Sequence, residues 1–289
     1  MDSTTMQELL HNWVVVLLLV LLVLLAATAT ALAFVQGREV QLWPPKFGGR
    51  PAQKAKSGSG KKDDGKRAGY HEFTVADARD FYAKIAPNYD QRNSGGFLRT
   101  QLKVVALIRS QWTRGRQLHV LDLGGGTGKL VAIPFFDEED IRWTYVDNCP
   151  SMAALFQDNL EGSRLEGTAE VRLWSVATAC DRLSAAAFDV IILSFTLSSM
   201  TEWPDFVKLR RLLRPDGVVI VSDAAHHGVE NPLYEVPVDK TVYALKIRTF
   251  SVAELTTRAK SAGFAVELLD HVGVGNTDYS FVVKLRNPR

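Results

Sequence analysis

Cysteine is scarce in this chain of 289 residues, which contains only Cys149 and Cys180. Neither has a Cys-x-x-Cys partner or a histidine at zinc-ligand spacing, so the sequence indicates neither a disulfide scaffold nor a metal site. An excess of one charge is also lacking, because 34 basic residues stand against 32 acidic ones. This balance does not favour nucleic-acid binding. The hydrophobic content of 46% is typical of a globular protein that carries extra apolar material.

Charges are absent from residues 13–35, a nearly unbroken run of valine, leucine and alanine. A helix rises about 1.5 Å per residue, so one of this length crosses roughly 30 Å of hydrocarbon. A cleavable signal peptide is the alternative, because residues 31–33 could form a cleavage site. However, Asp2 and Glu8 lie where a signal peptide carries basic residues. We therefore expect a short tail over residues 1–12 and a single-pass transmembrane anchor over residues 13–35.

Residues 36–69 have the composition of a flexible linker, rich in glycine, proline, serine and lysine. Nine basic residues between Arg38 and Arg67 face only three acidic ones. By the positive-inside rule, this excess predicts that the rest of the chain lies on the cytoplasmic side of the membrane. The linker can be a solvated tether or can contact anionic lipid head groups, and both interpretations stay open. We expect the folded domain to span residues 70–289.

A glycine-rich segment follows an apolar run at residues 119–130. The run suits a buried strand, and the glycines let the backbone turn sharply and approach a ligand closely. The spacing Asp-x-Gly-x-Gly-x-Gly differs from the dinucleotide fingerprint and from the P-loop, so phosphate binding is not favoured. The residues that this segment predicts for ligand binding are Asp122, Gly124, Gly125, Gly126 and Gly128.

A second apolar run, residues 142–146, ends in the carboxylate Asp147 about 20 residues after the turn. Doubly wound folds place an acid at this position against ribose hydroxyl groups. Asn148 follows and belongs to the same predicted site. Cys149, next to it, we interpret as a packing residue.

The two segments together resemble motif I and the next strand of the class I S-adenosylmethionine (SAM) methyltransferases. The resemblance implies that the glycine turn wraps the amino-acid end of SAM and that Asp122 helps to hold its ammonium group. It covers about residues 70–289. It implies an α/β, Rossmann-like fold with a seven-stranded, mostly parallel sheet, an antiparallel last strand and helices on both faces.

Residues 81–90 resemble the amino-terminal lid of methyltransferases that act on small molecules, including the ubiquinone and menaquinone C-methyltransferases. This resemblance implies that Phe81, Tyr82 and Tyr89 line an acceptor pocket. The alternative is that these aromatic residues are ordinary core on an amphipathic helix. Apolar residues at helical spacing predict a helix that Pro87 ends.

The sequence departs from the family after its third predicted strand, residues 171–174. The family has an aspartate there that accepts from the adenine amino group, whereas this chain has Val176. Backbone groups or Ser175 would then have to hold the adenine. Ser194 ends the next strand, at the sheet edge where open α/β folds bind ligands. The Asn/Asp-Pro-Pro-Tyr signature of methyltransferases acting on nucleobase or glutamine amino groups is absent, so we exclude those acceptors.

Two histidines, His226 and His227, follow the strand predicted at residues 218–222. An imidazole with a pKa near 6.5 can remove a proton at neutral pH, so both are candidates for a general base. The alternative is that they are structural or merely exposed. Residues 228–249 are too long for a simple loop and would complete a substrate pocket. A last helix from Ser251 and two closing strands are predicted to follow.

These observations predict a membrane-anchored, SAM-dependent methyltransferase that acts on a small, lipophilic acceptor. A tether raises the effective concentration of an enzyme toward substrates in the same membrane. One alternative is a methyltransferase-like scaffold that has lost turnover, which the valine at the adenine position would explain. Another is a methyltransferase that acts on protein side chains. No nucleic-acid partner is expected.

Overall fold

The computed structural model describes residues 69–288 except 93–96, 134–139, 226–231 and 275–276. The predicted tail, anchor and linker up to residue 68 lie outside the described residues, as do both histidines of the predicted general base. None of the helices in the described part is long and apolar enough to cross a membrane.

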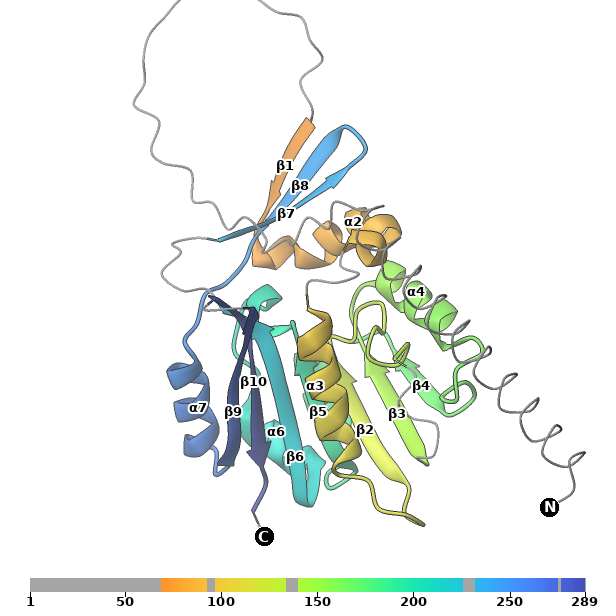
Figure 1. The fold of residues 1–289 in the computed structure, drawn as a ribbon, viewed down its shortest axis with the longest axis vertical. Helices are drawn as coiled ribbons and strands as arrows, with labels where there is room; N and C mark the ends of the chain where they lie inside the picture. The colour runs from red at the N-terminus through yellow and green to blue at the C-terminus, as the bar shows by residue number, and fades with distance from the viewer. Residues whose placement is uncertain (1–68, 93–96, 134–139, 226–231, 275–276, 289) are drawn as a thin grey trace, which may run out of the picture. The chain divides into compact units, whose positions relative to one another are not determined.

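A seven-stranded sheet forms the centre of the domain, with the strand order β4-β3-β2-β5-β6-β10-β9 (Figure 1). Strands β2 to β6 are parallel to one another, and β10 is antiparallel to both β6 and β9. The predicted antiparallel last strand is therefore confirmed. The strands are β2 (Leu118–Leu123), β3 (Ile141–Val146), β4 (Ala169–Arg172), β5 (Phe188–Ser194), β6 (Leu213–Ala224), β9 (Ala265–Val274) and β10 (Thr277–Arg286).

Helices cover both faces of this sheet, because neighbouring residues of a strand point to opposite sides. In β2, Val120 packs into the core beneath α3 and α4, whereas Leu121 packs into the core on the opposite face, beneath α5, α6 and α7. Figure 1 shows α3 in front of the sheet and α6 behind it. The helices are α3 (Leu98–Arg109), α4 (Pro150–Leu160), α5 (Val176–Arg182), α6 (Phe206–Leu212) and α7 (Val252–Ser261).

A second, three-stranded sheet was not predicted. Its order is β1-β8-β7, with β1 (Gly69–Phe73) parallel to β8 (Thr241–Lys246) and β7 (Leu233–Val238) antiparallel to β8. Asp239 adopts a left-handed φ of 52° in the tight turn between β7 and β8. The segment predicted as a pocket-completing insertion is therefore mainly a hairpin that pairs with the first described strand.

Helix α2 (Ala78–Arg92) packs against the three-stranded sheet (Figure 1). Phe81 and Ile85 are fully buried in the apolar core between them. The helix continues through Pro87, so the predicted end at this residue is wrong. A proline removes one helical hydrogen bond, but Tyr89 lies against the Lys129 ammonium and Asp90 accepts from Thr127, and these contacts with the rest of the domain hold the last turns.

Candidate functional site

A cavity of about 650 Å³ lies at the carboxyl ends of β2, β3 and β5, partly under α2. This volume is within the range of about 300–1,000 Å³ that is usual for small-molecule sites. Open α/β sheets bind ligands at this edge. Of the residues predicted to bind a cofactor or an acceptor, the cavity is lined by Tyr82, Tyr89, Asp122, Gly124, Gly125, Gly126, Asp147, Asn148, Ser175 and Ser194.

Two glycines of the turn after β2 have different surroundings. Gly126 has a φ of 55°, and an added Cβ would meet no atom within 4 Å, so this side of the turn faces open space. Gly128 has a φ of 77°, but its Cβ would lie 2.4 Å from the Phe156 ring. Gly128 is also absent from the residues that line the cavity. The structure thus brings Gly126 to the site, whereas Gly128 packs against α4.

Two carboxylates meet at the floor of the cavity. Asp122 is only 2% exposed, and burial, followed by the nearby charge of Asp147, raises its pKa to about 7. Burial also raises the pKa of Asp147, but backbone N–H groups oppose this shift. Gly126 donates its N–H to Asp147 Oδ2 at 3.0 Å, and Cys149 donates to Oδ1 at 2.8 Å. The floor therefore favours a cationic or hydroxyl-bearing ligand group.

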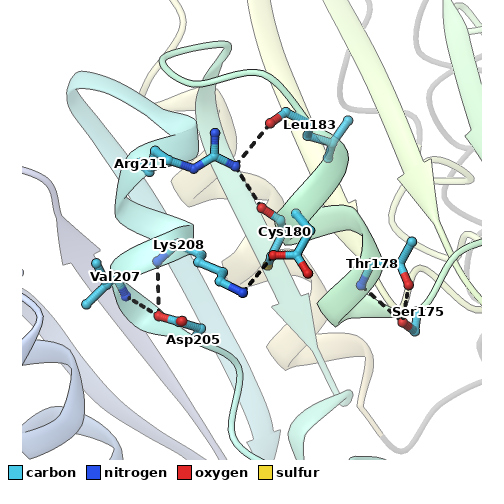
Figure 2. Close-up of polar contacts among 9 residues, drawn as sticks. Ser175, Thr178, Cys180, Leu183, Asp205, Val207, Lys208 and Arg211 are labelled. Atoms are coloured by element: carbon cyan, nitrogen blue, oxygen red, sulfur yellow. Dashed lines mark hydrogen bonds and ion pairs between the residues drawn. The ribbon is translucent and has the colours of Figure 1, made fainter.

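Ser175 serves as the N-cap of α5 in the wall of the cavity (Figure 2). Its Oγ accepts the backbone N–H of Thr178 at 3.1 Å and lies 2.9 Å from the Thr178 hydroxyl. The hydroxyl is therefore already engaged within the helix. Val176 lines the cavity beside it, in the position where the resemblance places the adenine.

Polar contacts fix α5 to α6 along this wall, as Figure 2 shows. Lys208 lies 2.6 Å from Asp181, and Arg211 donates to the carbonyl oxygens of Cys180 and Leu183 at 2.8 and 3.2 Å. Burial raises the pKa of the Cys180 thiol to about 11, so it stays protonated at neutral pH. Both cysteines are buried and unbridged, and we find a packing role for each.

Two of the three predicted lid residues, Tyr82 and Tyr89, line the cavity. The hydroxyl groups of Tyr82 and Ser199 are 2.8 Å apart, and the Tyr89 ring packs edge-on against that of Tyr82. Burial raises the pKa of both phenols, so they remain neutral hydrogen-bonding groups. Phe81 does not line the cavity and packs in the core under the small sheet, where the ordinary-core alternative is the better description.

Several residues around the site were not predicted to have a role in it. Ser199 follows β5 in the 3-10 helix η2 (Leu197–Ser199), and Asp223 at the end of β6 accepts the Ser198 N–H at 3.0 Å. Trp203 and Phe195 also line the cavity. Their positions depend on contacts between segments far apart in the chain. The places of Phe195 and Ser199 after the apolar strand β5, and of Asp223 near the end of β6, mark the ligand edge.

Comparison with known proteins identifies a family. Residues 70–269 match the sequence model of a methyltransferase domain family, which is more than half of the chain. A comparison with curated protein sequences gives no match.

Two solved structures show the same fold. The [4+2]-cyclase SpnF has 15% identity and a TM-score of 0.57, over 76% of this chain and 99% of its own. A SAM-dependent methyltransferase from Leishmania major has 13% identity and a TM-score of 0.52, over 73% of this chain and 82% of its own. At such low identities the likeness concerns the fold alone. Together with the family match, the glycine turn and the two acids at the sheet edge, it assigns this chain to the methyltransferase domain family, as a SAM-dependent methyltransferase with a class I fold.

Proposed function

We propose that the cavity binds SAM with its amino-acid end at the glycine-rich turn and its ribose at Asp147. The surroundings of the turn fit this ligand. The open side of Gly126 admits a close approach, and Asp122 supplies a negative charge for an ammonium group. Asp147 accepts the N–H of Gly126 on one oxygen and that of Cys149 on the other, and the Asn148 N–H adds to these. A carboxylate has about four acceptor sites, so one remains for a ribose hydroxyl.

The adenine would lie against Val176, whose side chain offers no carboxylate acceptor. Because Ser175 already caps α5, backbone groups of the first turn of this helix are the better candidates to bind the base. The Trp174 ring also lines the cavity, and the guanidinium groups of Arg172 and Arg182 lie 5.4 and 5.5 Å from its centre. Apolar contact would then replace the missing acceptor.

When bound, SAM supplies an electrophilic methyl group. The protein would contribute mainly proximity and orientation, by holding an acceptor in line with that group. Helix α2 and its aromatic residues would exclude water from this part of the cavity. If the acceptor must lose a proton, His226 or His227 would take it. The substitution of both histidines by alanine tests this role, and unchanged turnover at saturating SAM would reject it.

The acceptor that we propose is small and lipophilic. The observation that carries this proposal is the aromatic and apolar share of the cavity lining, to which Tyr82, Tyr89, Phe195, Met200 and Trp203 contribute. A cavity partly covered by an aromatic helix suits a flat, apolar molecule such as a quinone better than a protein side chain. A protein acceptor would need an open groove.

Transfer of a labelled methyl group from SAM tests the acceptor class. The full-length protein in detergent is incubated with membrane lipid extract, quinones or protein extract, and the label is then partitioned between organic solvent and precipitated protein. We expect the label in the organic phase. Label only in the protein pellet would favour the alternative of a protein methyltransferase.

We also propose that residues 13–35 anchor the protein in a membrane by a single pass, with the domain from about residue 70 on the cytoplasmic side. The uncharged apolar run and the basic segment after it support this arrangement. Extraction of cell membranes with alkaline carbonate tests the anchor. Full-length protein should stay in the membrane pellet, and a variant without residues 1–35 should be released. Release of the full-length protein would reject the anchor.

A methyltransferase-like scaffold without turnover is the second candidate function. The valine at the adenine position favours it, because a weaker cofactor site is one route to lost activity. A fold also does not determine chemistry, as a cyclase with this fold illustrates. The two functions differ in SAM binding, which a titration measures directly.

A further inference from the structure

Helix α2 is attached to the seven-stranded domain by polar contacts at two separate points. The first is the contact between the hydroxyls of Tyr82 and Ser199, 2.8 Å apart. The second is Asp90, near the end of the helix, which contacts the segment after β2. Pro87 lies between these points and removes one backbone hydrogen bond of the helix. The two halves of α2 are thus attached to different parts of the site.

The carboxylate of Asp90 joins three segments of the chain. The Thr127 hydroxyl, within the glycine-rich turn, donates to Oδ1 at 2.7 Å, and the Lys129 ammonium lies 3.5 Å from the same oxygen. Asn159, on α4, donates from Nδ2 to Asp90 Oδ2 at 3.4 Å and to the Thr127 carbonyl at 2.7 Å. One side chain of the lid helix therefore holds both the glycine turn and α4.

Two partners of Asp90, Thr127 and Lys129, line the cavity, whereas Asp90 itself and Asn159 do not. The Asp90 side chain is 39% exposed, but its partner Thr127 is only 2% exposed and the Lys129 side chain 19%, so the contacts lie on the shielded side of the carboxylate. The Lys129 ammonium also lies 5.7 Å from the centre of the Tyr89 ring, another part of the lining. Burial lowers the pKa of Lys129, and Asp90 opposes this shift. Asp90 thus acts on the cavity only through other side chains.

We propose that Asp90 is a positioning residue of the cofactor site, which couples helix α2 to the glycine-rich turn so that cofactor binding and ordering of the lid occur together. This rests on the proposed function, because it requires SAM beside the turn. A ligand that fixes the turn also fixes Thr127 and Lys129, and through Asp90 the end of α2. Coupling is reciprocal, so contacts that hold the lid strengthen cofactor binding by the same factor.

A purely structural role for Asp90 makes a different prediction. In that case its loss lowers the thermal stability of the protein, but SAM still changes the exchange of the α2 amides as in the wild type. The coupling role instead removes the response of α2 to SAM. Hydrogen exchange of residues 78–89, measured with and without saturating SAM, separates the two roles.

The experiment uses the full-length protein in detergent and combines calorimetric titration of SAM with hydrogen exchange. For Asp90→Ala we expect a Kd for SAM that rises roughly tenfold, within the usual range of coupling factors. We also expect that saturating SAM no longer protects α2. The matched control is Asp80→Ala, which removes an exposed carboxylate from the same helix that contacts no other polar group in the described residues. This control should behave as the wild type.

Thr127→Val provides a second test, because it removes the hydroxyl donor without changing charge. We expect the same two effects. Combining it with Asp90→Ala should add little further loss, since Asp90→Ala already removes the bond to Thr127 together with the contacts to Lys129 and Asn159. Wild-type Kd and wild-type protection of α2 in Asp90→Ala would overturn the proposal. If that variant does not fold, Thr127→Val decides by the same readouts. A wild-type protein that does not bind SAM would instead contradict the proposed function itself.

Discussion

Asp147 Oδ2 accepts the backbone N–H of Gly126 at 3.0 Å. The acid that ends β3 therefore holds the turn that follows β2, in addition to any bond that it makes to a ligand. Its other oxygen accepts the Cys149 N–H at the start of α4. Replacement of Asp147 consequently changes the shape of the cofactor turn as well as the charge of the site. Asp147→Asn, which keeps one amide oxygen as an acceptor, separates these effects better than Asp147→Ala alone.

Gly126→Ala and Gly128→Ala should have different consequences. Both place a non-glycine residue at a left-handed φ, which costs roughly 1–2 kcal/mol. Only Gly128→Ala also forces a Cβ to within 2.4 Å of the Phe156 ring, so its free energy of unfolding should fall by more. Gly126→Ala places its methyl group on the open side of the turn and should weaken SAM binding more than it lowers stability.

Thermal unfolding and SAM titration of the two variants check this prediction. Equal loss of stability in both would show that the contact with Phe156 is not rigid. Unchanged SAM affinity in Gly126→Ala would show that the cofactor does not approach this side of the turn.

SAM binding should strengthen as the pH rises through about 7. Burial and the charge of Asp147 raise the pKa of Asp122 to about 7, so its carboxylate is largely neutral at lower pH. An ammonium group binds the ionised form, and bound SAM should therefore lower this pKa. Titrations between about pH 6 and pH 8 measure the effect. Asp122→Asn should bind more weakly and without this pH dependence, whereas a wild-type slope in the variant would assign the effect to another group.

The raised pKa of Asp122 has the opposite effect on folding, because it lowers the stability of the folded protein as the pH rises. The folded protein holds the Asp122 proton more tightly than the unfolded chain, whose carboxyl has the ordinary pKa of 3.8. The contribution of this group to the free energy of unfolding is therefore full below about pH 4 and is lost as the pH rises to about 7. Denaturant unfolding of the wild type and Asp122→Asn at both pH values tests the sign, and the difference between the two proteins should change with pH.

Asp189→Ala should destabilise the fold without affecting SAM binding. Asp189 lies near the start of β5, away from the cavity edge, and accepts from Arg214 at 2.8 Å and from the His119 N–H at 2.9 Å. It also pairs with Arg116. Removing one partner of a buried ion pair lowers the free energy of unfolding by about 3–5 kcal/mol. Because both arginines are partly exposed, we expect a loss near the lower end of this range.

Asp181→Ala is the matched control for this prediction. Its carboxylate pairs with Lys208 on the surface, and such exposed pairs contribute less than about 1 kcal/mol. Urea unfolding gives both values, and SAM titration should give the wild-type Kd for both variants. Weak SAM binding by a folded Asp189→Ala protein would show that the two ends of the sheet are coupled.

Ser175→Ala should lower stability by about 1 kcal/mol, the usual cost of losing a helix N-cap. Because the hydroxyl is already bound within α5, the Kd for SAM should change less than threefold, a difference of roughly 0.6 kcal/mol. Calorimetry and thermal unfolding measure the two quantities. A large rise in Kd with unchanged stability would instead make Ser175 a direct contact of the adenine.

Local chemistry explains which features could be predicted from the sequence. The turn at residues 124–128 has left-handed backbone angles that favour glycine, and Asp147 directly follows a buried strand. Both features could therefore be predicted from a few neighbouring residues. The apolar strands β5 and β6 were recognisable for the same reason. Their order in the sheet followed from the resemblance to a family and not from the residues alone.

The remaining features depend on contacts between distant segments. Gly69 pairs with Thr241 in the small sheet, and no local pattern specifies this partner. Helix α2 continues past Pro87, and the contact of Asp90 with Thr127 near its end joins residues 37 positions apart, so neither residue reveals it by itself. The cap formed by Ser175 was likewise hidden, because a serine before a helix and a serine that binds a ligand look alike in a sequence.

Calorimetric titration of SAM into the full-length protein tests the central claim most directly, with Asp147→Ala and Asp147→Asn as controls. We predict micromolar binding by the wild type, weaker binding by the asparagine variant and loss of binding in the alanine variant. This result would establish a working cofactor site at the ends of β2 and β3. A folded wild-type protein that does not bind SAM would contradict the account and favour a scaffold without turnover.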